Sequence, residues 1–195
     1  MTSSSKCPVS RQLRTSHGMP LTALTKKVKE NSSQKPDRTD PWPAALRILT
    51  RRDYSQSELR QRLTDKGFDP ERIDFALQRC LELGYLDDAR YALNRATSLM
   101  NQGRAVGKRV LLDLRQRGVN EEIANRALQR AREACDEEQL LASLLERRFA
   151  NFSYDSAPAK ERRRVVHFLQ RRGFTIDRIM AQLTRKGLET RDENR

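Results

Sequence analysis

The stretch SQSELRQRLTDKGFDPERIDFAL, residues 55–77, has the pattern of two amphipathic helices joined by a glycine turn. Ser55 suits a helix N-cap and Glu58 stands three residues later, so the pair predicts a capping box at the start of the first helix. Gly67 ends that helix, because glycine adopts the left-handed conformation at a helix end without a steric penalty. Asp69 then suits the N-cap of the second helix.

Two weaker copies of this pattern follow downstream. They are VLLDLRQRGVNEEIANRAL, residues 110–128, and VVHFLQRRGFTIDRIMAQL, residues 165–183. The turn glycines Gly67, Gly118 and Gly173 recur at intervals of 51 and 55 residues. A helix pair that repeats with a period near 50 indicates an all-α repeat protein. No segment outside the helical spans shows the apolar alternation of a strand.

A further helix precedes each pair, which completes three-helix units. Pro43 suits the first turn of the earliest helix, and Ala45, Leu46, Ile48 and Leu49 are expected to face inward. Asp87 suits the N-cap that opens the second unit. We expect three-helix repeats at residues 41–86, 87–135 and 136–187, followed by a charged C-terminal tail at residues 188–195.

Residues 1–40 differ in composition from the rest of the chain. They hold eight basic and three acidic residues and none of the 11 aromatic residues. Such a segment buries too little apolar surface to offset its ordering entropy, so we expect a disordered basic tail. Two alternatives stay open: a mitochondrial transit peptide, and a translation start at Met19.

The charge of the chain predicts a polyanionic partner. The 195 residues carry a formal net charge of +13 at pH 7 and are 33% charged. This excess attracts nucleic acid, an acidic protein face or an anionic membrane, although a solvated arginine-rich helical surface gives the same count. No helix combines a broad apolar face with a basic one, so membrane or RNA binding rests on charge alone.

The compartment is predicted from cysteine usage and hydropathy. Cys7, Cys80 and Cys135 are scattered and odd in number, which argues against a disulfide framework and favours a reducing compartment. No apolar run approaches the roughly 20 residues of a membrane-spanning helix. The N-terminus lacks the apolar block of a secretory signal. We expect a cytoplasmic protein that makes no membrane contact.

The sequence predicts no catalytic residue, no metal site and no cofactor, and therefore no enzyme. GRAVGKR, residues 103–109, has one residue fewer between its glycines than a phosphate-binding loop, and Arg109 stands where such a loop needs Ser or Thr. No His or Cys pair has metal-ligand spacing. His167 is expected to be a partly buried helical residue. Cys80 and Cys135 lack a neighbouring histidine that would activate a thiol.

Basic residues in each copy are the candidate contacts to a nucleic acid or a filament. In a repeat array, related positions line up as a strip that suits an extended polyanion. The alternative is that arginine and lysine are good helix formers on solvated faces. The candidates are Arg60, Arg62, Lys66, Arg104, Lys108, Arg109, Arg115, Arg117, Arg162, Arg163, Arg164, Arg171 and Arg172.

The segments SQSELRQRLTDKGF, GYLDDARYA, LRQRGV and FLQRRGF, with Gly107 before a basic helix, resemble the RecX family, the bacterial regulators of the RecA recombinase. The resemblance spans residues 42–187. It implies a curved, elongated array of three tandem three-helix repeats without catalytic residues. It also implies binding in the groove of the RecA filament on single-stranded DNA, which depresses recombinase, ATPase and coprotease activity in DNA repair, recombination and the SOS response. We expect a monomer. The motif leaves the contact residues open.

Two functional hypotheses follow. In the first, the protein binds the RecA filament and inhibits it at amounts well below those needed to coat the DNA. In the second, helix-turn-helix-like repeats bind DNA alone and compete with the recombinase for it. The second hypothesis predicts tight, steeply salt-dependent binding to free DNA.

Overall fold

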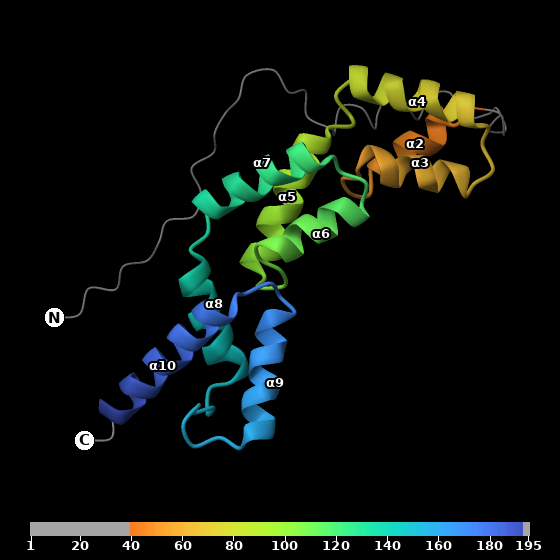
Figure 1. Cartoon of the computed structure of the whole chain (residues 1–195). Coiled ribbons are helices and arrows are strands. Elements are labelled where there is room, and N and C mark those ends of the chain that lie inside the picture. The colour runs from red at the N-terminus through yellow and green to blue at the C-terminus, as the bar shows by residue number, and fades with distance from the viewer. Residues whose placement is uncertain (1–39, 193–195) are drawn as a thin grey trace. The chain divides into compact units, whose positions relative to one another are not determined.

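The computed structural model describes residues 40–192, with side chains up to residue 186 (Figure 1). The expected disordered tail at residues 1–40 lies outside the described residues, except for Asp40. The described part is helical and contains no strand. Its helices are α2 (Trp42–Leu49), α3 (Gln56–Thr64), α4 (Pro70–Glu82), α5 (Asp88–Asn101), α6 (Lys108–Gln116), α7 (Glu121–Glu133), α8 (Glu137–Arg148), α9 (Ala159–Gln170) and α10 (Ile176–Asp192). The predicted all-α repeat fold is confirmed.

Helices α3, α4 and α5 begin at the capping residues that the sequence predicts, which are Ser55, Asp69 and Asp87. The Ser55 hydroxyl accepts a hydrogen bond from the Glu58 amide at 3.1 Å, and the Glu58 carboxylate accepts one from the Ser55 amide at 3.4 Å. Asp69, Asp87 and Asp136 cap α4, α5 and α8 in the same manner, each accepting from two backbone amides. Each such cap contributes about 1 kcal/mol, because it satisfies amides that have no partner within the helix.

The ends of the described region differ from the expectation in two respects. In α2, Ala45 is completely buried and Ile48 and Leu49 pack against the core as expected, but Leu46 is only half-buried and Ala44 is buried as well. At the other end, α10 continues through residue 187 to Asp192, into the segment expected to be a charged tail. A single glycine costs a helix only about 1 kcal/mol, so a glycine does not end a helix that its neighbours continue.

The buried apolar side chains form two clusters. One joins α2, α3 and α4 around Leu59, Leu63 and Leu77, which are almost completely buried. The other extends from Tyr91 to Leu183 and therefore includes helices α5 to α10. The first three-helix unit thus has a core of its own, whereas the helices of the second and third units share one core.

The two joins between successive units have related geometry. At the first, the hydroxyl of Ser55, which is completely buried at the start of α3, donates to the backbone carbonyl of Arg117 at 2.5 Å. At the second, the amide of Val106, just before α6, donates to the backbone carbonyl of Arg172 at 2.7 Å. Each acceptor is the residue that precedes a turn glycine, so the start of one unit's middle helix holds the turn of the next unit.

The turn glycines of the second and third units are fixed by close packing as well as by backbone conformation. Gly118 has φ +72°, and an added Cβ would collide with the side chain of Ser57 at the start of α3. Gly173 has φ +98°, and an added Cβ would collide with the carbonyl oxygen of Val106. At Gly67, with φ +82°, nothing lies within 4 Å of an added Cβ. Only the later two glycines therefore also serve as inter-unit contacts.

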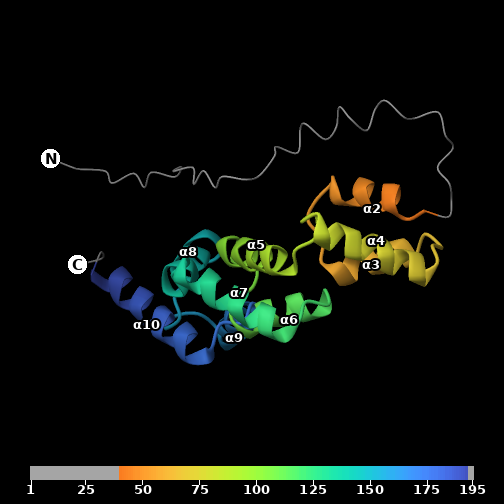
Figure 2. The same cartoon turned by 90° about the horizontal axis from the view of Figure 1, so that it is seen from above.

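These joins place the three middle helices end to end. The C-terminal end of α9 meets the start of α6, and the C-terminal end of α6 meets the start of α3. The same succession is visible in Figure 1, where α9, α6 and α3 follow one another, and Figure 2 shows α6 and α3 one after the other from above, with α9 overlapped by its neighbours. Along this line the three helices follow one another in the reverse of their order in the sequence. Most of the candidate basic residues lie on these helices or at their ends.

Candidate polyanion interface

The outer face of α9 is rich in basic residues. Apart from Ala159 and the acidic Glu161 in the first turn, its exposed residues follow helical spacing opposite the buried Val165 and Leu169. They are Lys160, Arg163, Arg164, His167 and Gln170, and the exposed Arg171 directly after the helix continues this face. None of them forms an ion pair with a carboxylate of the described residues, and Arg163 donates only to the Ala159 carbonyl of its own helix. With 12 residues, α9 presents this face over roughly 18 Å.

The basic face of α9 continues onto α6, with a lower charge density. Lys108 and Arg109 are exposed in the first turn of α6, which contains no acidic residue. Arg115 is exposed further along and pairs with Glu121 at 3.1 Å. Because both partners are well exposed, this ion pair is weak and leaves Arg115 able to exchange its partner.

On α3 two of the three expected contacts have a partner within the first unit. The Arg60 guanidinium pairs with Asp74 of α4, and since both side chains are exposed this ion pair is weak as well. The Arg62 guanidinium lies 4.9 Å from the centre of the Tyr54 ring. Lys66 is exposed beyond the helix end. The strip expected across all three copies is therefore uneven, and its free positive charge decreases from α9 through α6 to α3.

Arg117 was expected on the outer face, but it lies in the join between the first two units. Its Nη1 donates to Glu58 Oε1 at 2.7 Å and its Nε to Asp113 Oδ2 at 2.9 Å. Arg95 holds the same Asp113 carboxylate with two hydrogen bonds, and the Tyr91 hydroxyl donates to Glu58 at 2.9 Å. The Arg117 side chain is only 24% exposed, so its role is structural.

Electrostatics within this join support the charged state of its members. Burial acts to lower the pKa of Arg117, but the hydrogen bonds and charges of Asp113 and Tyr91 together outweigh it, so the pKa of Arg117 is raised. Burial likewise acts to raise the pKa of Asp113, yet the hydrogen bonds from Arg95 and Arg117 lower it on balance. These side chains bind one another, which removes them from a polyanion interface.

Arg172 occupies the equivalent place in the second join. Its Nε donates to the Gly103 carbonyl at 3.1 Å, and its guanidinium stacks 3.5 Å from the centre of the Phe168 ring. Burial, followed by the nearby charges of Arg148 and Arg171, lowers the pKa of Arg172. Three arginines therefore gather where α8 and α9 end, and an anion bound there would relieve their repulsion.

The remaining predicted residues lie near this join or at the far end of α9. Arg104 is exposed in the loop before α6, and an added Cβ at Gly173 would lie 3.0 Å from the Cβ of Arg109. The fold thus brings Arg109 beside the third unit's turn. Arg162 is half-buried, with its guanidinium 5.5 Å from the centre of the Tyr154 ring. It therefore borders the outer face of α9 without being part of it.

Sequence reasoning missed Lys160, His167 and Arg148 as members of this basic surface. The helical spacing of α9 relative to Val165 and Leu169 was the signal that could have found the first two. His167 is exposed, contrary to the expected partial burial. Arg148 could not have been found in this way, because its proximity to Arg172 depends on how α8 packs in the fold.

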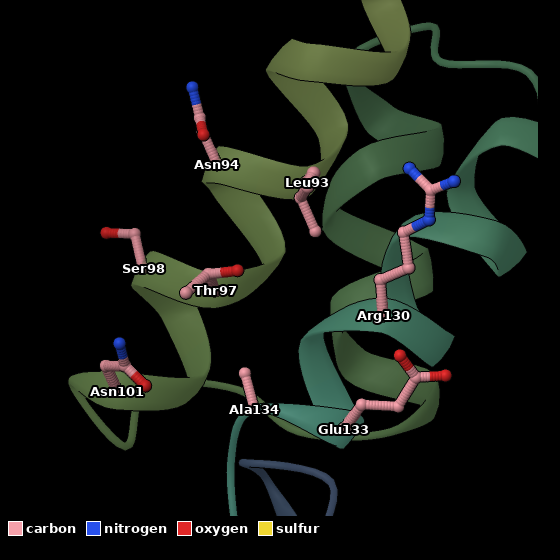
Figure 3. A pocket seen from close by; sticks show the side chains of 8 residues that line it. All are labelled: Leu93, Asn94, Thr97, Ser98, Asn101, Arg130, Glu133 and Ala134. Carbon is pink, nitrogen blue, oxygen red and sulfur yellow. The ribbon is translucent and has the colours of Figure 1, made fainter. Parts of the chain in front are cut away.

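A shallow groove of about 640 Å³ lies between α5 and α7 (Figure 3). In the figure, Leu93 and Thr97 of α5 point toward α7, while Asn94 and Ser98 point away from it. Arg130 and Glu133 of α7 line the opposite side. Because these two charges have opposite signs and the other polar groups are neutral, the groove has no preference for a polyanion.

Two other classes of site are absent from the described residues. Within residues 40–192, no helix has the length and apolar character needed to span a bilayer. The same part of the chain contains no cluster of three or more His, Cys, Asp or Glu side chains that could hold a metal ion.

Comparison with known proteins places this architecture in a family. Residues 44–80 match the model of the first three-helix domain of RecX, and residues 136–183 match that of the third. The regulatory protein RecX of Syntrophotalea carbinolica is 44% identical over 137 residues, which cover 70% of this chain and 90% of the relative. That of Vibrio vulnificus is 35% identical over 140 residues, covering 72% of this chain and 88% of the relative.

A solved structure agrees in fold. The crystal structure of RecX from Lactobacillus salivarius superposes with a TM-score of 0.63 at 22% identity, covering 75% of this chain and 94% of that one. At this identity the likeness concerns the fold alone, and the sequence relatives carry the assignment. From the sequence matches over most of the chain, we conclude that this protein belongs to the RecX family of regulatory proteins.

Proposed function

We propose that this protein binds the filament that the RecA recombinase forms on single-stranded DNA and mainly inhibits its recombinase, ATPase and coprotease activities. The observation that carries the proposal is the outer face of α9, where Lys160, Arg163, Arg164 and Arg171 have no carboxylate partner among the described residues. Cations left unpaired on one face are available to phosphates, whereas a cation such as Arg117, which is paired and mostly shielded from solvent within the fold, is not.

The end-to-end arrangement of α9, α6 and α3 supports an extended partner. A nucleic acid or a filament presents its anionic groups in a row, and the basic faces of α9 and α6 follow one another along the same line. Several weak contacts made together give an affinity that none of them gives alone. The first unit, whose Arg60 and Arg62 are already engaged, remains available for a surface that is less negative, such as the recombinase.

This assignment of surfaces explains why binding would inhibit the filament. A protein that holds DNA phosphates through α9 and a recombinase subunit through its first unit would occupy the space that a second DNA strand needs. It would also fix neighbouring subunits relative to one another, which opposes the movements of ATP turnover. Both effects require one molecule to span several subunits, so few molecules would affect a long filament.

The decisive experiment is RecA ATP hydrolysis on single-stranded DNA, with this protein titrated from far below the recombinase concentration. We expect strong inhibition at a small fraction of the recombinase. Inhibition that begins only when the protein suffices to coat the DNA would refute filament binding and establish simple competition for DNA. The absence of inhibition at every ratio would refute both mechanisms.

The unpaired face of α9 also favours a second candidate function, direct binding to single-stranded DNA without the recombinase. Phosphate contacts make the logarithm of the binding constant fall linearly with the logarithm of the salt concentration, by about 0.7 for each contact on a single strand. Tight binding to free DNA with a steep slope, in the absence of inhibition below DNA saturation, would select this alternative.

A charge-reversal variant tests the role of α9 in either mechanism. Arg163→Glu, Arg164→Glu and Arg171→Glu together should weaken binding and inhibition without loss of helical content. The matched control replaces Arg47, Arg90 and Arg147 by Glu, since these exposed arginines lie outside the three middle helices and donate to backbone carbonyls of their own segments. Both variants change the net charge equally, so equal losses would refute a specific role of α9.

A further inference from the structure

A second pocket, of about 460 Å³, opens beside the basic face of α9. Its walls come from the loop before α9, from α9 itself and from the start of α10. Tyr154 stands on the loop side, Val166 and His167 on α9, and Ile176 and Met180 on α10. Pockets that take small organic ligands have volumes of roughly 300–1,000 Å³, so this one has a suitable size.

The groups that line the pocket are flat or apolar, and none of the lining residues is acidic. The Arg162 guanidinium lies 5.5 Å from the centre of the Tyr154 ring, so a cationic plane and an aromatic ring share one wall. Ile176, which is 44% exposed, leaves an aliphatic surface open to the solvent at the mouth. Aromatic rings, histidine and arginine planes are the surfaces on which unpaired bases stack.

The pocket is continuous with the candidate polyanion interface. Arg163 and His167 line the pocket and also belong to the exposed basic face of α9. A strand whose phosphates follow that face therefore passes the mouth of the pocket. The distance from a phosphate to its own base is short, so a base of the same nucleotide can enter while its phosphate stays on the basic face.

We propose that this pocket binds one unstacked base of single-stranded DNA, with Tyr154 as the stacking surface and Arg163 as the contact to the adjacent phosphate. The proposal rests on the proposed function in that it names the ligand of the same surface. A base combines a flat apolar face with a neighbouring anion, and the pocket combines flat stacking groups with neighbouring cations. An acidic peptide with one apolar side chain would match the charge, but it would make no use of the paired planes of Tyr154 and Arg162.

The test compares binding of the full chain to two synthetic strands of equal length. One strand is ordinary oligothymidylate, and the other is its abasic analogue, which has the same phosphates and no bases. Fluorescence anisotropy should show tighter binding of the ordinary strand, by on the order of 5- to 150-fold for a single stacked base. Tyr154→Ala should abolish this preference and leave binding of the abasic strand unchanged.

Two further variants make the result specific to the pocket. Phe75→Ala removes another aromatic ring, which is 73% exposed on α4, and it should leave the preference intact. Ile176→Glu places a carboxylate at the pocket mouth and should also abolish the preference. Glutamate is favourable in the first turn of a helix, so this variant is expected to fold even if Tyr154→Ala does not. Its matched control is Leu83→Glu, at another aliphatic residue that is 52% exposed.

Equal affinity of the unmodified protein for both strands would overturn the pocket proposal. The proposed function would survive that result if reversing the α9 charges still weakened binding of both strands and inhibition of RecA. A Tyr154→Ala variant that keeps the base preference but inhibits RecA less would also overturn the proposal, because the pocket would then hold a side chain of the recombinase.

Discussion

Arg117 donates a hydrogen bond from Nη1 to Glu58 Oε1 at 2.7 Å and so joins helices whose residues lie 59 positions apart in the chain. The Arg117 side chain is 24% exposed and that of Glu58 is 18% exposed, so solvent screens the pair only in part. Glu58 also completes the capping box of α3 and accepts from the Tyr91 hydroxyl. One carboxylate therefore both starts a helix and binds two units together.

Glu58→Ala should destabilise the protein by roughly 1–3 kcal/mol, because it leaves the half-buried Arg117 and the buried Tyr91 without this partner and removes half of the capping box. Urea unfolding of the full chain at pH 7, followed by circular dichroism, measures the change. Glu122→Ala is the control, since Glu122 and its partner Arg126 are both well exposed. We expect the control to cost less than about 0.5 kcal/mol, and equal costs would show that the join contributes nothing.

Gly173→Ala should be considerably more destabilising than Gly67→Ala. Both glycines have a positive φ, which costs a residue with a side chain roughly 1–2 kcal/mol. Only at Gly173 would the added methyl also collide with a backbone atom, the carbonyl oxygen of Val106. The difference between the two variants in thermal unfolding therefore isolates the packing of the third unit's turn on the second. Equal shifts in Tm would mean that the contact between Gly173 and Val106 rearranges with little loss of free energy.

The join between the first two units should weaken in acid through Asp113. Hydrogen bonds from Arg95 and Arg117 outweigh burial and hold the pKa of Asp113 below its ordinary value. A carboxylate with a lowered pKa in the folded state stabilises the fold above its unfolded pKa of about 3.9. That contribution is lost as the pH falls from about 4 through the folded-state pKa.

Asp113→Asn provides the measurement for this pH dependence. The variant should be less stable than the unmodified protein at pH 7, and the gap should narrow as the pH falls below about 4. Free energies of unfolding at several pH values between 7 and 3 determine the gap. A gap of constant size would assign the cost to missing hydrogen bonds alone, without a contribution from ionisation.

Local signals of the sequence predicted the helices well because their causes are local. Ser55, Asp69 and Asp87 cap helices through contacts within three residues, and these contacts need no knowledge of the fold. Asp88 shows where this reasoning ends. Its carboxylate accepts from the Gln56 amide at 2.8 Å and thereby serves the start of α3 in another unit.

The sequence predicts a polyanion contact made by arginines and lysines, but it does not predict which of them remain free of partners within the fold. Net charge predicts that arginines meet a polyanion, but it does not separate those that bind carboxylates of the same chain. Arg117 and Arg171 illustrate the difference, since both flank a helix end near a turn glycine, yet only Arg171 is free of ion pairs among the described residues. An arginine stays free for a polyanion only if the neighbouring unit places no carboxylate beside it, and that depends on tertiary packing.

The final prediction compares α9 with α3, because the number of basic side chains without a partner in the described part of the chain decreases from α9 through α6 to α3. Arg163→Glu with Arg164→Glu changes two arginines of α9 that have no acidic partner among the described residues. Arg60→Glu with Arg62→Glu changes the net charge equally on α3, where Asp74 and Tyr54 already engage the side chains. The α9 pair should lower the salt slope of single-stranded DNA binding by about 0.7 for each phosphate that the variant no longer binds, whereas the α3 pair should leave it nearly unchanged.

Titrations of fluorescent single-stranded DNA at several salt concentrations measure both slopes, and thermal unfolding shows which variant loses stability. The α3 pair should lower Tm more, because Arg60→Glu would set a second carboxylate against Asp74 and Arg62→Glu would remove the stacking on Tyr54. Equal decreases of slope would mean that DNA contacts all three middle helices evenly. The proposed decrease of DNA contact from α9 to α3 would then be wrong, because a DNA strand bound evenly by all three helices would leave no unit available for the recombinase.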